Sequence, residues 1–133
     1  MNLQIEQSVS DWLASLEAFE GIAIHCGQSD QEIPNDEPLI MVACEDINNP
    51  APTLVSASVR VIVSTPSVIA DSFNDHRNLV ASLRNALNND IGTLPEYSSY
   101  LLIAGAAVNG WNESQSNDRW LSQVNLTLGM VEL

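Results

Sequence analysis

One twelve-residue stretch near the middle of the chain alternates regularly between apolar and mostly polar side chains. Within Leu54–Thr65, the odd-numbered positions from 55 to 63 hold valine or alanine, and the even-numbered positions from 56 to 64 hold three serines, Arg60 and Ile62. Because successive side chains of a β-strand point to opposite faces of a sheet, this stretch predicts a strand with one buried and one largely polar face. Such a strand is typical of an antiparallel sheet that is covered on one side only.

Two segments have the three- and four-residue apolar spacing of amphipathic helices. The first spans residues 5–19 and is expected to place Glu6 on its polar side. The second spans Ser67–Asn88, and Phe73 belongs to its predicted apolar face. Both helices must bury their apolar faces, and the one-sided strand offers the surface that they need.

Four further strands complete the predicted fold, and polar segments connect them. The strands are expected over residues 22–26, 39–44 and 100–108 and from residue 120 onward, with loops over residues 27–38, 45–52 and 110–118. We expect the last loop to protrude. The fold class is therefore α+β: a mostly antiparallel sheet of four to five strands with two helices packed on one face. The length fits a single domain spanning residues 1–133.

The charge balance restricts the possible partners. The chain has 17 acidic residues, four arginines and no lysine, which gives a net charge of −13 at pH 7. Nucleic-acid binding requires a basic patch, and this composition cannot supply one. An acidic surface can keep a protein soluble, attract a basic partner, or line a passage along which DNA slides. No apolar segment reaches the length of a membrane span, and the first residues lack the features of a signal peptide, so we expect a cytosolic chain without membrane contact.

The sequence contains no motif for catalysis, cofactor binding or metal binding. His25, Cys26, Cys44 and His76 do not have the spacing of zinc ligands. The nucleophile elbow, the phosphate-binding loop and the calcium loop are also absent from the sequence. We therefore expect no enzymatic activity, no cofactor and no metal ion. Both thiols are expected to be free, with a Cys26–Cys44 disulfide as the alternative if the two residues lie on neighbouring strands.

Tryptophan and arginine are enriched at the energetic centres of protein interfaces, and several of them gather near the predicted C-terminal loop. Because the chain has few bases, we expect each arginine to meet an acid of a neighbouring subunit. The alternative is that Trp120 belongs to the core and Trp111 covers an edge. The predicted interface residues are Arg60, Trp111, Arg119 and Trp120, together with the acidic pairs Asp36, Glu37 and Glu45, Asp46.

This layout resembles that of phage tail-terminator and neck proteins, including the lambda-type tail terminator. The resemblance rests on the opening helix, the entry into a strand over Asp36–Val42, the strand end at Thr65-Pro66, the helix Ser67–Asn88, and the C-terminal hairpin. It implies a structural virion protein that forms a ring, expected to be hexameric, at the head-proximal end of the tail. The ring would stop growth of the tail tube and join the tail to the head-side connector.

The resemblance also implies a location and a role for the lumen. The protein would be assembled in the host cytoplasm and reside in the tail or neck of the virion, and DNA would pass through the ring without specific binding. Two alternatives stay open: another neck or head-completion connector subunit, which would have a similar order of elements, or an acidic inhibitor that mimics DNA and binds a basic partner.

Overall fold

The computed structural model describes residues 2–27, 37–51, 54–67, 72–97, 101–116 and 119–132. A five-stranded sheet runs in the spatial order β1-β2-β3-β5-β4; β1 is parallel to β2, and every other neighbouring pair is antiparallel. The predicted α+β class and mostly antiparallel sheet are thus confirmed. The elements in chain order are α1 (Asn2–Ser15), the 3₁₀ helix η1 (Glu17–Phe19), β1 (Ala23–Cys26), β2 (Leu39–Ala51), β3 (Leu54–Pro66), α2 (Ser72–Asn89), the 3₁₀ helix η2 (Ile91–Tyr97), β4 (Leu101–Ser116) and β5 (Arg119–Glu132).

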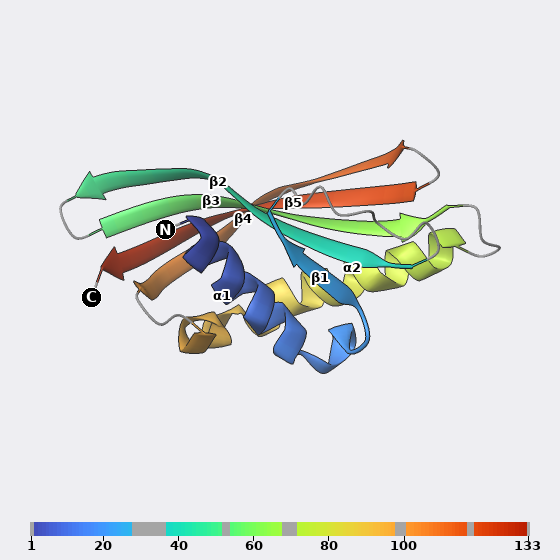
Figure 1. The fold of residues 1–133 in the computed structure, drawn as a ribbon, viewed down its shortest axis with the longest axis horizontal. Coiled ribbons are helices and arrows are strands. Elements are labelled where there is room, and N and C mark those ends of the chain that lie inside the picture. The colour runs from blue at the N-terminus through green and yellow to red at the C-terminus, as the bar shows by residue number, and fades with distance from the viewer. Residues whose placement is uncertain are drawn as a thin grey trace.

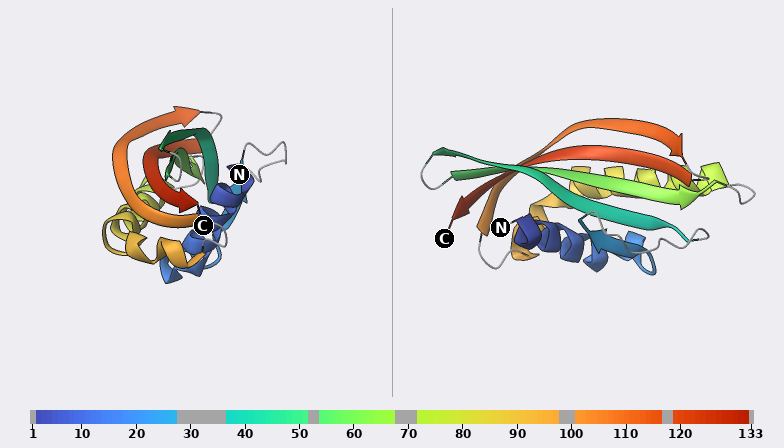
Figure 2. Two further views of the ribbon diagram at one scale, coloured as in Figure 1. Left: turned by 90° about the vertical axis from the view of Figure 1, so that its left-hand side faces the viewer. Right: turned by 45° about the horizontal axis from the view of Figure 1, so that its top comes forward.

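The helices lie on one side of a strongly twisted sheet (Figures 1 and 2). Helix α1 packs against β1 and β2, and α2 packs against β3 and β5. The opposite side, which we call the open face, is covered by no helix of the described chain. The prediction of helices on one face is therefore confirmed, but their number differs slightly, because the 3₁₀ helices η1 and η2 add to the two predicted α-helices. None of the helices in the described ranges is long and apolar enough to cross a membrane.

Strand β3 holds the centre of the sheet and provides much of the core. Its alternation is observed as predicted, because Val55, Ala57, Val59, Val61 and Val63 are all buried. Each faces a buried side chain of β5, and Val59, Val61 and Val63 also face buried residues of β2. Removing this apolar surface from water contributes about 25 cal/mol per Å².

Helix α1 buries two polar residues, Glu6 and Ser10, in addition to its apolar face. Glu6 is only 6% exposed, so its predicted place on the polar side is wrong. The helix ends at Ser15, and η1 follows, which carries Phe19 into the core. Gly21 then turns the chain with φ +81°, a conformation that favours glycine.

Helix α2 spans Ser72–Asn89 and buries a face that includes Val80, Leu83 and Leu87. Residues 68–71 of the predicted helix lie outside the described residues. Phe73 lies on the predicted apolar stripe, yet its side chain is 45% exposed. Phe73 lies in the first turn of α2. The apolar stripe of the helix therefore continues beyond the buried core at the N-terminal end of α2.

Two predicted loops are strands. Strand β2 continues through the polar and proline-containing segment to Ala51, and β4 continues to Ser116, where it pairs with Arg119. The register shifts twice in β2 and twice in β4, and one of the shifts in β4 falls between Ile103 and Gly105. Each shift inserts extra residues, which lets an irregular sequence remain paired with a regular partner strand. The prediction of a protruding loop over residues 110–118 is therefore wrong, because the pairing leaves only residues 117–118 between the two strands.

A buried polar contact connects α2 to the sheet. His76 is 3% exposed, and its Nδ1 and Nε2 each lie 2.7 Å from a hydroxyl oxygen, that of Thr65 on β3 and that of Ser122 on β5. His76 therefore lies at the boundary between α2 and the sheet, within the core. Both hydroxyl groups are buried as well, so the imidazole provides hydrogen bonds where water cannot.

We expect His76→Leu to lower the free energy of unfolding by about 1–3 kcal/mol for each hydroxyl group left without its partner. The leucine would fill much of the space but can neither donate nor accept a hydrogen bond. Urea unfolding followed by circular dichroism measures the loss. The control is Asn78→Leu at an exposed position of α2, which should change the free energy by about 0.5 kcal/mol or less. Equal losses in the two variants would contradict a stabilising role for the imidazole.

Candidate functional site

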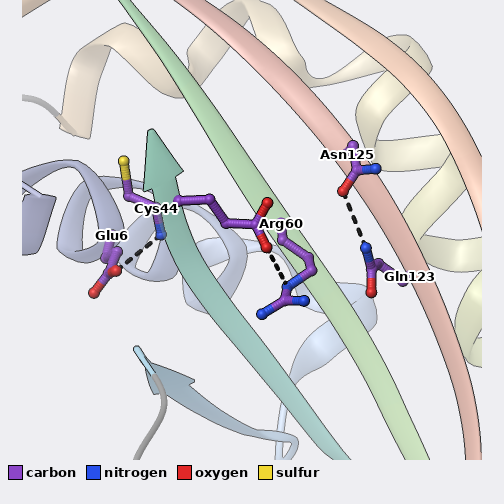
Figure 3. A network of polar contacts seen from close by, with 6 residues as sticks. Glu6, Cys44, Arg60, Gln123 and Asn125 are labelled. Atoms are coloured by element: carbon purple, nitrogen blue, oxygen red, sulfur yellow. Dashed lines mark hydrogen bonds and ion pairs between the residues drawn. The ribbon is translucent and has the colours of Figure 1, made fainter. Parts of the chain in front are cut away.

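The open face carries an ion pair at its centre (Figure 3). Nε of Arg60 lies 3.0 Å from Oε1 of Glu45, at ion-pair distance, but the N–H group does not point along a hydrogen bond. Glu45 is the extra residue of a β-bulge, because Cys44 and Asp46 oppose consecutive residues of β3. Arg60 therefore has an acid of its own chain at ion-pair distance, and its contact with a neighbouring subunit stays a prediction. The predicted loop around Glu45 and Asp46 is wrong, because both residues belong to β2.

Polar side chains extend the open face from this pair toward β5. Arg60 opposes Asn125, and Nε2 of Gln123 donates to Oδ1 of Asn125 at 3.2 Å (Figure 3). Half-buried Met41 and Ile62 lie on the same face. The open face is thus a mixed surface that has both apolar side chains and side-chain amide groups. Protein interfaces commonly have such a composition.

Arg119 serves as an internal anchor. The side chain is 7% exposed; its Nε donates to the hydroxyl group of Ser64 at 2.6 Å, and its Nη2 donates to the carbonyl oxygens of Glu37 at 2.6 Å and Ser64 at 3.2 Å. Burial lowers the pKa of Arg119 below its ordinary value. These contacts join the start of β5 to the end of β3 and to the bend that precedes β2. The guanidinium group is therefore used within the chain, and the expected contact with a neighbouring subunit does not fit its burial.

Trp120 belongs to a small exposed cluster, which we call the aromatic patch: Phe73, Arg77 and Trp120. The rings of Phe73 and Trp120 have centroids 5.0 Å apart and are tilted by 59°. Cζ of Arg77 lies 5.6 Å from the centroid of Phe73, within the range of a cation–π contact. Phe73 is the one large apolar side chain that is exposed in the described part of the chain. Sequence reasoning found Trp120 but missed its two partners, although the four-residue spacing of Phe73 and Arg77 puts them on one helix face.

A hollow of about 310 Å³ lies between η1 and the C-terminal half of α2. Leu16, Ala18 and Ala86 form its apolar wall, and Glu17 and Asp90 contribute two exposed acids. The remaining wall is formed by Ser82 and Asn85. We call this feature the acidic hollow. No sequence pattern predicts the acidic hollow, because Glu17 and Asp90 are far apart along the chain.

The buried carboxylate of Glu6 occupies the free edge of β2, just beyond the end of β1 (Figure 3). Its Oε1 accepts a hydrogen bond of 2.8 Å from the backbone N–H of Cys44. Strand β1 pairs with β2 only as far as Val42, so Glu6 replaces the missing strand partner. Burial, and next the charge of Glu6, raises the pKa of the Cys44 thiol. Cys26 opposes Val42, and both cysteines are free thiols although they lie on neighbouring strands.

The other predicted interface residues lie apart from these clusters. Trp111 is a residue of β4, opposite Val124, and not of a loop. Glu37 is exposed in the bend before β2, and Asp46 is exposed opposite Ser58. Asp36 lies outside the described residues.

A buried pair of a base and a hydroxyl group lies between α2 and β5. His76 and Ser122 are hydrogen-bonded like a base and a nucleophile, but Ser122 is 0% exposed, and a hydroxyl group rather than a carboxylate orients the imidazole. In the described ranges, no three His, Cys, Asp or Glu side chains are placed to hold a metal ion. The candidate features at the surface of the described residues are the open face, the aromatic patch and the acidic hollow.

Comparison with known proteins gives no family. No family model matches the chain, and no curated protein matches it. Among solved structures, one protein whose name states no function aligns with 98% of this chain and 91% of its own, at 17% sequence identity and a TM-score of 0.32.

The two arginines of the sheet should differ sharply in their effect on stability. We expect Arg119→Ala to lower the free energy of unfolding by at least about 2 kcal/mol, because it breaks hydrogen bonds to a buried charged group. Arg60→Ala should lower it by about 1 kcal/mol or less, since partly exposed ion pairs contribute little. Chemical denaturation of the two variants side by side provides the comparison. A similar loss of unfolding free energy in both variants would contradict the prediction that burial makes Arg119 the more stabilising residue.

The raised pKa of Cys44 predicts a loss of stability in alkaline solution. The unfolded chain releases this proton around the ordinary value of 9.0, whereas the folded chain retains it to higher pH. Stability is therefore fully present below pH 9.0 and falls as the pH rises toward the folded pKa. Urea unfolding at a series of pH values should show this fall in the wild type. The loss of stability should be smaller in Glu6→Gln, and in Cys44→Ala the part that comes from Cys44 should be absent. Equal dependence of stability on pH in all three proteins would refute the assignment of this loss to Cys44.

Proposed function

We propose that the protein is a structural subunit that forms a ring at the head-proximal end of a phage tail. The ring stops growth of the tail tube and joins the tail to the head-side connector, as tail terminators do. The subunit acts through its surfaces and not through catalysis. The observation that carries the proposal is the long edge strand β4.

Strand β4 has 16 residues and pairs with β5 alone within the described chain. An edge strand presents a row of unpaired N–H and C=O groups, which form a template for a strand of another chain. Proteins that act as monomers shorten or cover such edges, whereas a 16-residue edge favours pairing between copies. The strand next to the opposite edge, β2, also extends beyond its short partner β1. Two unlike free edges on one sheet suit a head-to-tail contact, which generates a ring when the rotation closes.

The charges support a lumen through which DNA passes. Arg60 and Arg119 are used within the chain, and the sequence has no lysine. A ring of such subunits offers few cations to phosphate groups, so DNA would slide through without being held. The same charge supports attraction to a basic surface on the tail tube or on the connector.

The order of elements also supports the proposal. The opening helix, the alternating strand that ends near Thr65-Pro66, the long helix and the C-terminal hairpin follow in the order on which the resemblance to tail terminators rests. Residence in the virion tail and assembly in the host cytoplasm are part of the same proposal.

The test is the assembly state of the purified chain, alone and with tail-tube subunits. Analytical ultracentrifugation should show a closed oligomer, and negative-stain microscopy should show rings, which cap tubes when tube subunits are added. Tail tubes grown with the protein should stop at a limited length, and tubes grown without it should not. Monomers at every concentration, both alone and with tube subunits, would overturn the proposal; capture of basic proteins by such a monomer would favour the inhibitor that mimics DNA.

A further inference from the structure

The aromatic patch and the acidic hollow are complementary, and we propose that the patch of one copy docks into the hollow of the next. This inference rests on the proposed ring and assigns one contact within it. The patch is Phe73, Arg77 and Trp120; the hollow has the apolar wall and the acids Glu17 and Asp90 described above.

The patch has the composition of an interface anchor. Phe73 is 45% exposed although its ring lies against that of Trp120 in a tilted arrangement, so much of the phenyl side chain is open to solvent. Arg77 lies over that ring, and no carboxylate of the described residues lies within ion-pair distance of its guanidinium group. Aromatic and arginine side chains dominate the binding energy of interfaces when a pocket on the partner receives them. Within the described residues, Phe73 and Arg77 therefore have neither an apolar pocket nor an acid as a partner.

The hollow supplies both. Its volume of about 310 Å³ is ample for an aromatic ring, since an engineered cavity of about 150 Å³ binds benzene. Leu16, Ala18 and Ala86 provide an apolar wall. Glu17 and Asp90 are both exposed, and neither carboxylate is hydrogen-bonded or paired within the described chain. A phenyl ring in the hollow would thus bring Arg77 to two acids.

The two features are placed for a head-to-tail contact between copies. Phe73 and Ala86 lie 13 residues apart near opposite ends of α2, a separation of about 20 Å along its axis. Thirteen residues also turn the helix by more than three and a half turns, so the two side chains point to different flanks. The patch cannot reach the hollow of its own chain, but one copy can use its patch and its hollow with two different neighbours. A ring requires a contact of this heterologous kind.

Charge reversal on each side of the contact provides the test. Arg77→Glu should weaken self-association by about tenfold or more, because it removes the cation from the hollow and adds a repelled acid. Glu17→Arg combined with Asp90→Arg should weaken it similarly. Mixing the two variants should restore association between unlike copies, since the cation and the acids then meet with exchanged positions. Sedimentation velocity of each variant and of the mixture measures these shifts, and unfolding curves establish that each variant is folded.

The control is Gln4→Glu, which adds an acid at an exposed position of α1 away from both features and should leave association unchanged. If the wild type forms rings and Arg77→Glu forms them equally well, the docking inference fails and the proposed function stands. If both reversals weaken association but their mixture does not recover it, patch and hollow are not partners, and the inference fails as well. If the wild type is monomeric under every condition, both the inference and the proposed function fail.

Discussion

The packing of one face of β3 determines where every other element can lie. Valine and alanine alternate along this central strand, so one face is apolar over its whole length, and β2 and β5 add their own buried side chains beside it. Only this face can bury the apolar stripes of α1 and α2, and both helices must therefore share one side of the sheet. The other face has serines and Arg60 in the central strand, which do not favour a second helical layer. The alternation of apolar and polar residues in β3 thus accounts for a two-layer arrangement with one open face.

Buried polar groups lie where the regular hydrogen-bond ladder or the helix layer ends. Glu6 accepts the N–H of Cys44 where β1 stops, and His76 joins α2 to hydroxyl groups of two strands. Arg119 holds the carbonyl oxygen of Glu37 at the entry to β2. In each case a side chain provides the hydrogen bond that backbone or water would otherwise supply, because a buried group without a partner costs about 1–3 kcal/mol. These three contacts fix the positions of the helix layer and of the strand ends relative to the sheet.

The periodic parts of the fold could be predicted from the sequence, and the parts that depend on pairing could not. Strand β3 and both α-helices can be predicted, because their apolar residues recur with the period of a strand or of a helix. The ends of β2 and β4 contain asparagine, proline, serine and glycine, whose local preference is for turns. Pairing with β3 and β5 overrides that preference, and bulges absorb the mismatch. Of the predicted interface residues, Trp120 is half-buried at a surface, whereas Arg119 is internal, since no local pattern tells an exposed arginine from one that binds backbone carbonyls.

The distribution of charge limits which surfaces can join copies of this chain. Residues 1–50 hold ten acids and no base, whereas residues 51–133 hold seven acids and four arginines, a net charge of −3 (7 − 4 = 3). Copies that met through two N-terminal parts would repel each other, and like charges at an interface are costly. Strand β4, β5 and α2 all belong to the less acidic part, where main-chain pairing along β4 is insensitive to side-chain charge. A contact between the two parts is better still, because an unpaired arginine from the second meets acids of the first. The exposed cation Arg77 and the exposed acid Glu17 have this relation, so a net negative charge is compatible with the proposed contact between copies.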